Sequence, residues 1–150
     1  MAEQPSEAPC RICEYEREPP PGGWFFQTEH WSVGRHQTME VPGWVVCQLR
    51  RHAPGLVDMT AAELSSMGPT LAAVAQVITA ETDAERVYFV SFGENHRHVH
   101  VVLIPRGPGI PAHHRSSSLH ANAKLYADPA GAAEAERRFR AALAATRPAG

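Results

Sequence analysis

Residues 95 to 106 constrain the fold of this chain more than any other stretch. His96, His98 and His100 stand at alternate positions and lead into an apolar, β-branched run that ends at Pro105. Such alternation favours a β-strand, in which every second side chain lies on the same face. We therefore expect the three imidazoles on one face of a strand and the valines and leucine between them in a core.

A row of imidazoles is suited to metal binding or to phosphoryl chemistry, because imidazole is a good metal ligand and a nucleophile near neutral pH. The alternative is a solvated strand edge that carries histidines without a function. Three histidines within five residues, running directly into an apolar strand, favour a functional site.

The other apolar segments predict the remaining sheet. A tight turn at residues 93–95 is expected to connect the histidine strand to the strand before it, which makes the two antiparallel neighbours. A turn at residues 27–30 and a loop at 34–42 would separate the earlier strands. Together with the histidine strand, the expected strands are 24–26, 31–33, 43–49 and 87–92.

Two helices are predicted. Thr60 and Glu63 have the spacing of a capping box, which starts a long helix reaching about residue 80. Gly68-Pro69 predicts a kink or a division of this helix into two segments. Residues 130–146 are alanine-rich and predict a C-terminal helix that Pro148 stops. The elements give an α+β fold with a five-stranded antiparallel sheet, one long helix and a C-terminal helix.

Composition limits the class of protein. A chain of 150 residues with 43% hydrophobic content predicts one domain spanning residues 1–150. A net charge of −2 argues against a nucleic acid polymer as partner, because such binding needs an excess of basic residues. The sequence contains neither a long apolar run nor a basic, then apolar, N-terminus, so we expect no membrane segment, no signal peptide and a cytoplasmic location.

Cys10 and Cys13 have the spacing of a zinc knuckle. A redox pair is the competing interpretation, but redox Cys-x-x-Cys motifs usually open a helix after a strand, and here an acidic run and a proline-glycine run follow. Residues 1–9 are polar and expected to be loose. Cys47 lies within an expected strand and is predicted to be a core residue. His52 follows the same strand, either as a ligand or as a surface histidine.

Taken together, these segments resemble the histidine triad superfamily, whose motif is His-x-His-x-His-x-x with apolar x, often followed closely by Pro-Arg, as at Pro105-Arg106. Two registers fit: one starts the motif at His96, and the other starts it at His98 and has Val102 in third place. We prefer the second, because the first puts Arg97 in an apolar position. The resemblance covers about residues 10–106, and the loop and helix of residues 107–150 lie outside it.

The resemblance implies a structural zinc and a covalent mechanism. In zinc-containing branches of the superfamily the matching ligands would be Cys10, Cys13, His52 and His98. The second motif histidine, here His100, would attack the α-phosphate of a nucleotide and carry a nucleotidyl–histidine intermediate; in the alternative register this role falls to His98. The resemblance implies a nucleotide hydrolase or nucleotidyltransferase, and a homodimer as in many members.

Two departures from the pattern qualify this expectation. Val102 cannot donate a hydrogen bond to phosphate, so Asn95 or His96 is the candidate for that role. The superfamily's ribose-binding aspartate also has no match, and His36 lies nearest to its position. A zinc-stabilised binding or regulatory domain with reduced catalysis is therefore the alternative function, and a metalloenzyme with an open histidine site is a third. The histidines of the serine-rich segment, His113, His114 and His120, are expected to be mobile surface residues, with a second metal site as the alternative.

Overall fold

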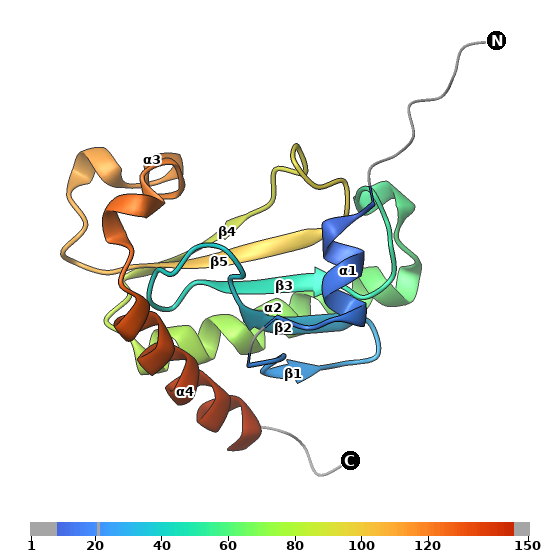
Figure 1. The fold of residues 1–150 in the computed structure, drawn as a ribbon, viewed down its shortest axis with the longest axis horizontal. Coiled ribbons are helices and arrows are strands. Elements are labelled where there is room, and N and C mark those ends of the chain that lie inside the picture. The colour runs from blue at the N-terminus through green and yellow to red at the C-terminus, as the bar shows by residue number, and fades with distance from the viewer. Residues whose placement is uncertain (1–8, 21, 146–150) are drawn as a thin grey trace.

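The computed structural model describes residues 9–20 and 22–145 (Figure 1). Its elements are α1 (Arg11–Arg17), β1 (Phe26–Gln27), β2 (Trp31–Arg35), β3 (Val45–Leu49), η1 (Leu56–Asp58), α2 (Ala61–Glu81), β4 (Arg86–Val90), β5 (His100–Arg106), η2 (Ala112–His114), α3 (Ser117–Ala121), η3 (Ala123–Tyr126) and α4 (Pro129–Ala145). The five strands form one antiparallel sheet in the order β1-β2-β3-β5-β4. The predicted α+β fold class is confirmed.

The register of β3 against β5 gives the sheet two different faces. Cys47 pairs with Val101 and Gln48 pairs with His100, and adjacent residues of a strand point to opposite faces. The face of Cys47 and Val101 packs on α2 and α4, and Cys47 is a core residue as predicted. This core is formed by Val33, Val45, Cys47, Val74, Val77, Ile78, Val101, Leu103, Ala135, Phe139 and Leu143.

The opposite face carries Gln48 and His100 and is covered in part by α1. Figure 1 shows α1 crossing in front of β2 and β3, with α2 behind the sheet. Ile12 of α1 is buried, and its carbonyl accepts a hydrogen bond from the Gln48 side chain. Glu16, one turn further along α1, accepts hydrogen bonds from Gln48 and Ser32. These polar contacts hold α1 on the sheet.

The prediction of a strand over residues 95–106 was wrong in its first half. β4 ends at Val90 and β5 begins at His100, so residues 91–99 form a long connection in place of a tight turn. The physical reason lies at Val99, whose amide donates to Ala53 and whose carbonyl accepts from Leu49. The Leu49 bond continues the β3–β5 register, but the Val99 amide donates to Ala53 and not to β3, so the regular ladder stops at His100. His98 then lies among the cysteines, while His96 lines the same cavity as His100.

The capping box of α2 is confirmed. The Glu63 amide donates to the Thr60 hydroxyl, and the Glu63 carboxylate accepts from the Thr60 amide. The helix then continues through Pro69 as one element, so the two-segment alternative was wrong. A proline removes one backbone hydrogen bond, and the packing of Val74, Val77 and Ile78 in the core outweighs that loss.

Several helices were not predicted. α1 starts directly after Cys10, whose Sγ accepts from the Cys13 amide. η2, α3 and η3 occupy the segment that was expected to be a serine-rich loop. The C-terminal helix is confirmed as α4, although residue 146 and Pro148 lie outside the described residues, as do residues 1–8 of the expected loose N-terminus. No helix in the described part of the chain is long and apolar enough to span a bilayer.

Candidate metal centre and active site

The four predicted zinc ligands come together in space. One nitrogen or sulfur atom from each of Cys10, Cys13, His52 and His98 lies within 4.8 Å of every other. Cys10 caps α1 and Cys13 lies one turn later, which puts both thiols on one side of the helix start. His52 follows β3 and His98 precedes β5. Because β3 and β5 are antiparallel neighbours, the end of one lies beside the start of the other.

The donor distances match those of a tetrahedral zinc site. The Nδ1 atom of His98 lies 3.4 Å from the Sγ atoms of both Cys10 and Cys13, and the Nδ1 atom of His52 lies 3.4 Å from Cys13 Sγ. Bond lengths of about 2.3 Å for zinc–sulfur and about 2.1 Å for zinc–nitrogen give a separation of about 3.6 Å at the tetrahedral angle. The arrangement therefore fits zinc with four protein ligands.

The ring orientation of His98 is fixed by its second nitrogen. Nε2 lies 2.6 Å from the Leu49 carbonyl oxygen, which can only accept, so Nε2 carries the proton. This leaves the Nδ1 lone pair directed at the cysteines, as an outer hydrogen bond does for metal-binding histidines. The ring is 1% exposed, and burial lowers the pKa of His98, which also favours the neutral form that binds metal.

Without a metal ion the Cys13 thiol stays protonated at neutral pH. Burial, followed by the hydrogen bond with Cys10, raises the pKa of the Cys13 thiol to about 11. A protonated thiol is a weak ligand, whereas a bound metal ion deprotonates a coordinating thiol outright. In the absence of a nearby disulfide, since Cys10, Cys13 and Cys47 are all free, the chemistry of this donor set is that of a metal centre.

His100 lies next to the metal centre and faces a cavity. Its Nδ1 lies 2.6 Å from the main-chain carbonyl oxygen of His98 and therefore donates to it. The proton is thus held on Nδ1, and the Nε2 lone pair is left for another partner. Burial lowers the pKa of His100, while the His98 carbonyl opposes this shift. A neutral imidazole with a fixed tautomer can act as a nucleophile.

The cavity beside His100 has a volume of about 550 Å³. Both residues predicted to hold phosphate, Asn95 and His96, line it, and the His96 ring lies 6.3 Å from the His100 ring. Val102 also lines it. His96 is thus in the cavity wall, whereas His98 lies among the cysteines. The other lining residues are Arg11, Ile12, Tyr15, His36, Gln37, Thr38, Met39, Val46, Gln48, Val90, Phe92, Gly93, Glu94 and His120.

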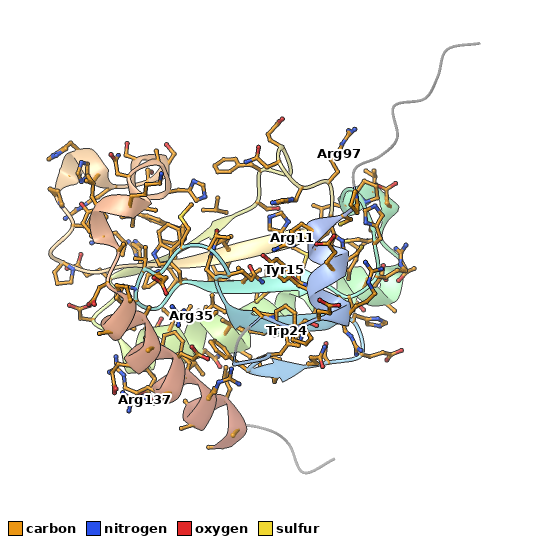
Figure 2. The ribbon with its side chains drawn as sticks, viewed as in Figure 1. Arg11, Tyr15, Trp24, Arg35, Arg97 and Arg137 are labelled. Carbon is orange, nitrogen blue, oxygen red and sulfur yellow. The ribbon has the colours of Figure 1, made fainter. Side chains whose placement is uncertain are left out.

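The sequence did not point to several of these residues. Arg11 and Tyr15 stand on the unpredicted α1 (Figure 2), with the Arg11 guanidinium 5.1 Å from the centre of the Tyr15 ring. Gln48 is buried beside His100, and its Nε2 donates to Ile12 and Glu16 while Oε1 has no protein partner. A lone glutamine in an apolar strand has no spacing that marks it as functional.

Among the serine-rich segment's histidines, the expectation for His120 was wrong. His120 is partly buried on α3, lines the cavity and stacks on Trp44. His114 is partly buried and is hydrogen-bonded to the Tyr126 hydroxyl. His113 is exposed as expected. The helical folding of residues 112–126 over the sheet brings His120 to the cavity. No local sequence pattern predicts this position.

Comparison with known proteins identifies the fold. No protein-family model matches the sequence, and no curated protein sequence matches it. The structure, however, is similar to that of a Hit-like protein involved in cell-cycle regulation from Bartonella henselae. The TM-score is 0.66 at 16% sequence identity, and the match covers 90% of this chain and 97% of that one. The chain has the histidine triad fold.

Two further structures with related folds extend the comparison. A zinc-bound histidine triad family protein from Mycobacterium smegmatis is similar with a TM-score of 0.63 and 18% identity, over 91% of this chain and 94% of that one. A uridylyltransferase is similar with a TM-score of 0.65 and 16% identity, over 93% of this chain but 46% of that one. The histidine triad resemblance is thus confirmed at the level of the fold, and the cysteine–histidine cluster fits a structural zinc site in it.

Proposed function

We propose that this protein is a nucleotide hydrolase or nucleotidyltransferase of the histidine triad type, with His100 as nucleophile. The observation that carries the proposal is the hydrogen bond from His100 Nδ1 to the His98 carbonyl in the wall of a cavity. This bond selects the tautomer whose Nε2 lone pair is available for phosphorus. Two similar structures, a hypothetical histidine triad nucleotide-binding protein from Sulfolobus tokodaii and a uridylyltransferase, support a nucleotide as the substrate class.

The chemistry divides into two displacements. The Nε2 lone pair of His100 attacks the α-phosphorus, a phosphorus–nitrogen bond forms, and the bond to the leaving group breaks. The leaving group departs with the electron pair and takes up a proton. Water or another acceptor then attacks phosphorus, loses a proton, and the phosphorus–nitrogen bond breaks to return neutral His100. Covalent catalysis of this kind replaces one difficult step by two easier ones.

Phosphate oxygens need hydrogen-bond donors that Val102 cannot provide. We assign this role to His96 and Asn95, which line the same cavity on the connection of residues 91–99. Both side chains are exposed at the cavity and carry nitrogen donors. Donors positioned where negative charge develops lower the barrier for phosphoryl transfer.

Zinc has a structural role in this proposal. Cys10, Cys13, His52 and His98 would fill all four positions of a tetrahedral shell, which leaves none open for substrate. When bound, the metal would supply cross-links between α1, the end of β3 and the start of β5. Its influence on catalysis is indirect, because the backbone carbonyl of His98 orients His100.

A nucleotidyl adduct is the decisive test. The protein is incubated with phosphoramidate and aminoacyl nucleotides, and its intact mass is measured before the adduct is mapped by peptide mass spectrometry. The proposal predicts an adduct on His100 that is absent from His100→Ala. An adduct on His98 would favour the register that starts the motif at His96. The absence of any adduct, with zinc bound, would favour the alternative function.

That alternative, a zinc-stabilised nucleotide-binding or regulatory domain with reduced catalysis, rests on two observations. Val102 stands in the cavity wall at the third motif position. The ribose-binding aspartate of the superfamily has no match in this chain, and the nearest residue, His36, has its Nδ1 accepting from the amides of Thr38 and Met39. Burial lowers the pKa of His36 to about 4, so the ring is neutral at pH 7. Nucleotide binding without turnover in the wild-type protein would support this function.

We also propose that the protein forms a homodimer. β4 is an outer strand of the sheet, so one of its edges has no strand beside it within the described residues. Phe89, the fourth of the five residues of this strand, is 54% exposed. Unpaired strand edges and exposed aromatic side chains are surfaces that proteins tend to cover, and a second copy with twofold symmetry would cover both.

A further inference from the structure

We infer that the cavity contains a subsite for a planar aromatic ring of the substrate, formed by His120 and Phe92. The inference rests on the proposed function only in assuming that a phosphate group is bound at His100. Both rings line the cavity that contains His100. Their centres lie 5.4 Å apart with an angle of 71° between the planes, so the rings form two adjacent walls of a corner.

The orientation of His120 is fixed from behind. Its ring stacks on Trp44, with a centre distance of 6.0 Å and an angle of 18° between the planes. Trp44 is almost fully buried and packs edge-on against His36 at 6.1 Å. The neighbouring Leu119 is buried in the same apolar cluster as Trp44. Since one face of the His120 ring is occupied by Trp44, the subsite needs little rearrangement to receive a ligand at the cavity side.

Phe92 lines the cavity and is largely exposed. It is 63% exposed although it is a large aromatic residue. Val46, Val90 and Val102 provide an apolar floor to the same cavity. An aromatic ring of a ligand would bury this surface, and stacking on aromatic side chains tolerates any planar ring.

A polar group is also left without a partner at this cavity. Gln37 follows His36 in the chain and lines the cavity, and its side-chain nitrogen Nε2 is buried without a hydrogen-bond partner in the protein. Buried donors are satisfied in nearly all proteins. A ring with an acceptor atom on its edge, such as a heteroaromatic ring, would supply the partner.

The location of the subsite indicates on which side of His100 the aromatic ring would lie. α1 and α3 lie over opposite ends of the sheet in Figure 1, and the cavity is lined by residues of both. His120 comes from α3, whereas Arg11 and Tyr15 come from α1. The aromatic ring of the substrate would therefore lie on the α3 side of the phosphate bound at His100. A nucleobase and an aromatic leaving group share this chemistry, and the experiment separates them.

Calorimetric binding to the zinc-loaded protein tests the subsite with three probes. Ribose 5-phosphate carries the phosphate and sugar alone, adenosine 5′-monophosphate adds the nucleobase, and the phenyl ester of adenosine 5′-monophosphate adds a second ring on phosphorus. We expect one added ring to strengthen binding, and His120→Ala and Phe92→Ala each to remove about 5- to 100-fold of that gain. If the variants reduce the gain in affinity from ribose 5-phosphate to adenosine 5′-monophosphate, the subsite binds the nucleobase. If they reduce the gain from adenosine 5′-monophosphate to its phenyl ester, the subsite binds the leaving group.

Two variants serve as controls. His120→Phe keeps a planar ring on Trp44 and should retain most of the gain, whereas His120→Ala should not. Leu125→Ala changes an exposed residue of the same segment that does not line the cavity, and should bind all probes as the wild type does. Phe92 is exposed, so Phe92→Ala tests the subsite even if the His120 variants are unstable.

The inference is overturned if no added ring strengthens binding, or if both alanine variants keep the full gain. These results are independent of the proposed reaction, because the probes are compared by binding alone. A missing nucleotidyl adduct combined with a ring-dependent gain lost in both variants would reject the proposed function and retain the subsite. An adduct on His100 without any ring-dependent gain in affinity would retain the proposed function and reject the subsite.

Discussion

The side chain of His98 belongs to the metal centre, and the main chain of the same residue contacts His100. Its Nδ1 lies 3.4 Å from two cysteine sulfurs, and its carbonyl oxygen accepts from His100 Nδ1 at 2.6 Å. His98 therefore has two roles. Its side chain helps to hold the N-terminal helix through the zinc site, and its carbonyl fixes the tautomer of His100, the proposed nucleophile. Removing the metal ligand and removing the nucleophile should consequently have different effects.

The first prediction concerns metal content. Purified protein should contain about one zinc per chain, and Cys13→Ser should lower both zinc content and melting temperature, because binding free energy of a structural metal contributes to folding. Metal analysis and thermal unfolding measure the two effects. Cys47→Ala is the matched control, since Cys47 is buried in the core away from the cluster and should lose stability while keeping zinc. A stable, metal-free wild-type protein would contradict the prediction.

The second prediction separates the three histidines. His100→Ala should keep zinc and fold while losing about 10³-fold or more in turnover, as expected for loss of a nucleophile. His98→Ala should lose zinc. His96→Ala should keep zinc and lose about 10²-fold or less, if its ring only stabilises phosphate charge. Zinc analysis and steady-state kinetics of the three variants distinguish these patterns. If His96→Ala lost zinc and His98→Ala kept it, His96 would be the zinc ligand and His98 the nucleophile.

The third prediction concerns acid stability. The Arg51 guanidinium binds both carboxylate oxygens of Glu63, at 2.7 and 2.8 Å, and with the Thr60 amide lowers the pKa of Glu63 to about 2. The carboxylate thus adds stability above pH 4.5, its ordinary pKa. This contribution should decline as the pH falls from there toward about 2. We expect about 1–2 kcal/mol at pH 7, because solvent reaches the half-exposed Arg51.

Urea unfolding at several pH values checks this effect. Glu63→Gln should be less stable than the wild type at pH 7, and the difference should shrink as the pH approaches 2–3. Zinc loss in acid affects both proteins alike, so only the difference between them reports on Glu63. Glu29→Gln, at a side chain that is almost fully exposed, is the control and should show little difference at any pH. A pH-independent difference for Glu63→Gln would rule out the ionic origin.

The fourth prediction concerns assembly. If β4 forms the centre of a homodimer, light scattering should give twice the chain mass, and Phe89→Glu should shift the protein toward monomer because it puts a charge at an apolar contact. Val57→Glu, at an exposed apolar residue of η1, is the control and should leave the mass unchanged. A monomeric wild type at all concentrations tested would exclude this interface.

Short-range patterns of residues were sufficient to predict several parts of this protein. Cys10 and Cys13, the capping box of Thr60 and Glu63, and the alternation into β5 each act through neighbours a few residues away. These patterns predicted the donor types, the long helix and the α+β fold. The resemblance to the histidine triad motif then grouped the distant ligands, and the structure brings all four within reach of one metal ion.

The different positions of His96, His98 and His100 depend on the tertiary structure. A strand pattern is unchanged by a shift of two residues, so the sequence left open which histidine faces the cysteines. Before His100 the Val99 carbonyl still accepts from Leu49, but the Val99 amide donates to Ala53 and leaves the ladder, and His98 lies among the cysteines. Gln48 and His120 reach the cavity through strand pairing and through the packing of α3. Such contacts join residues far apart in the chain, and no local spacing encodes them.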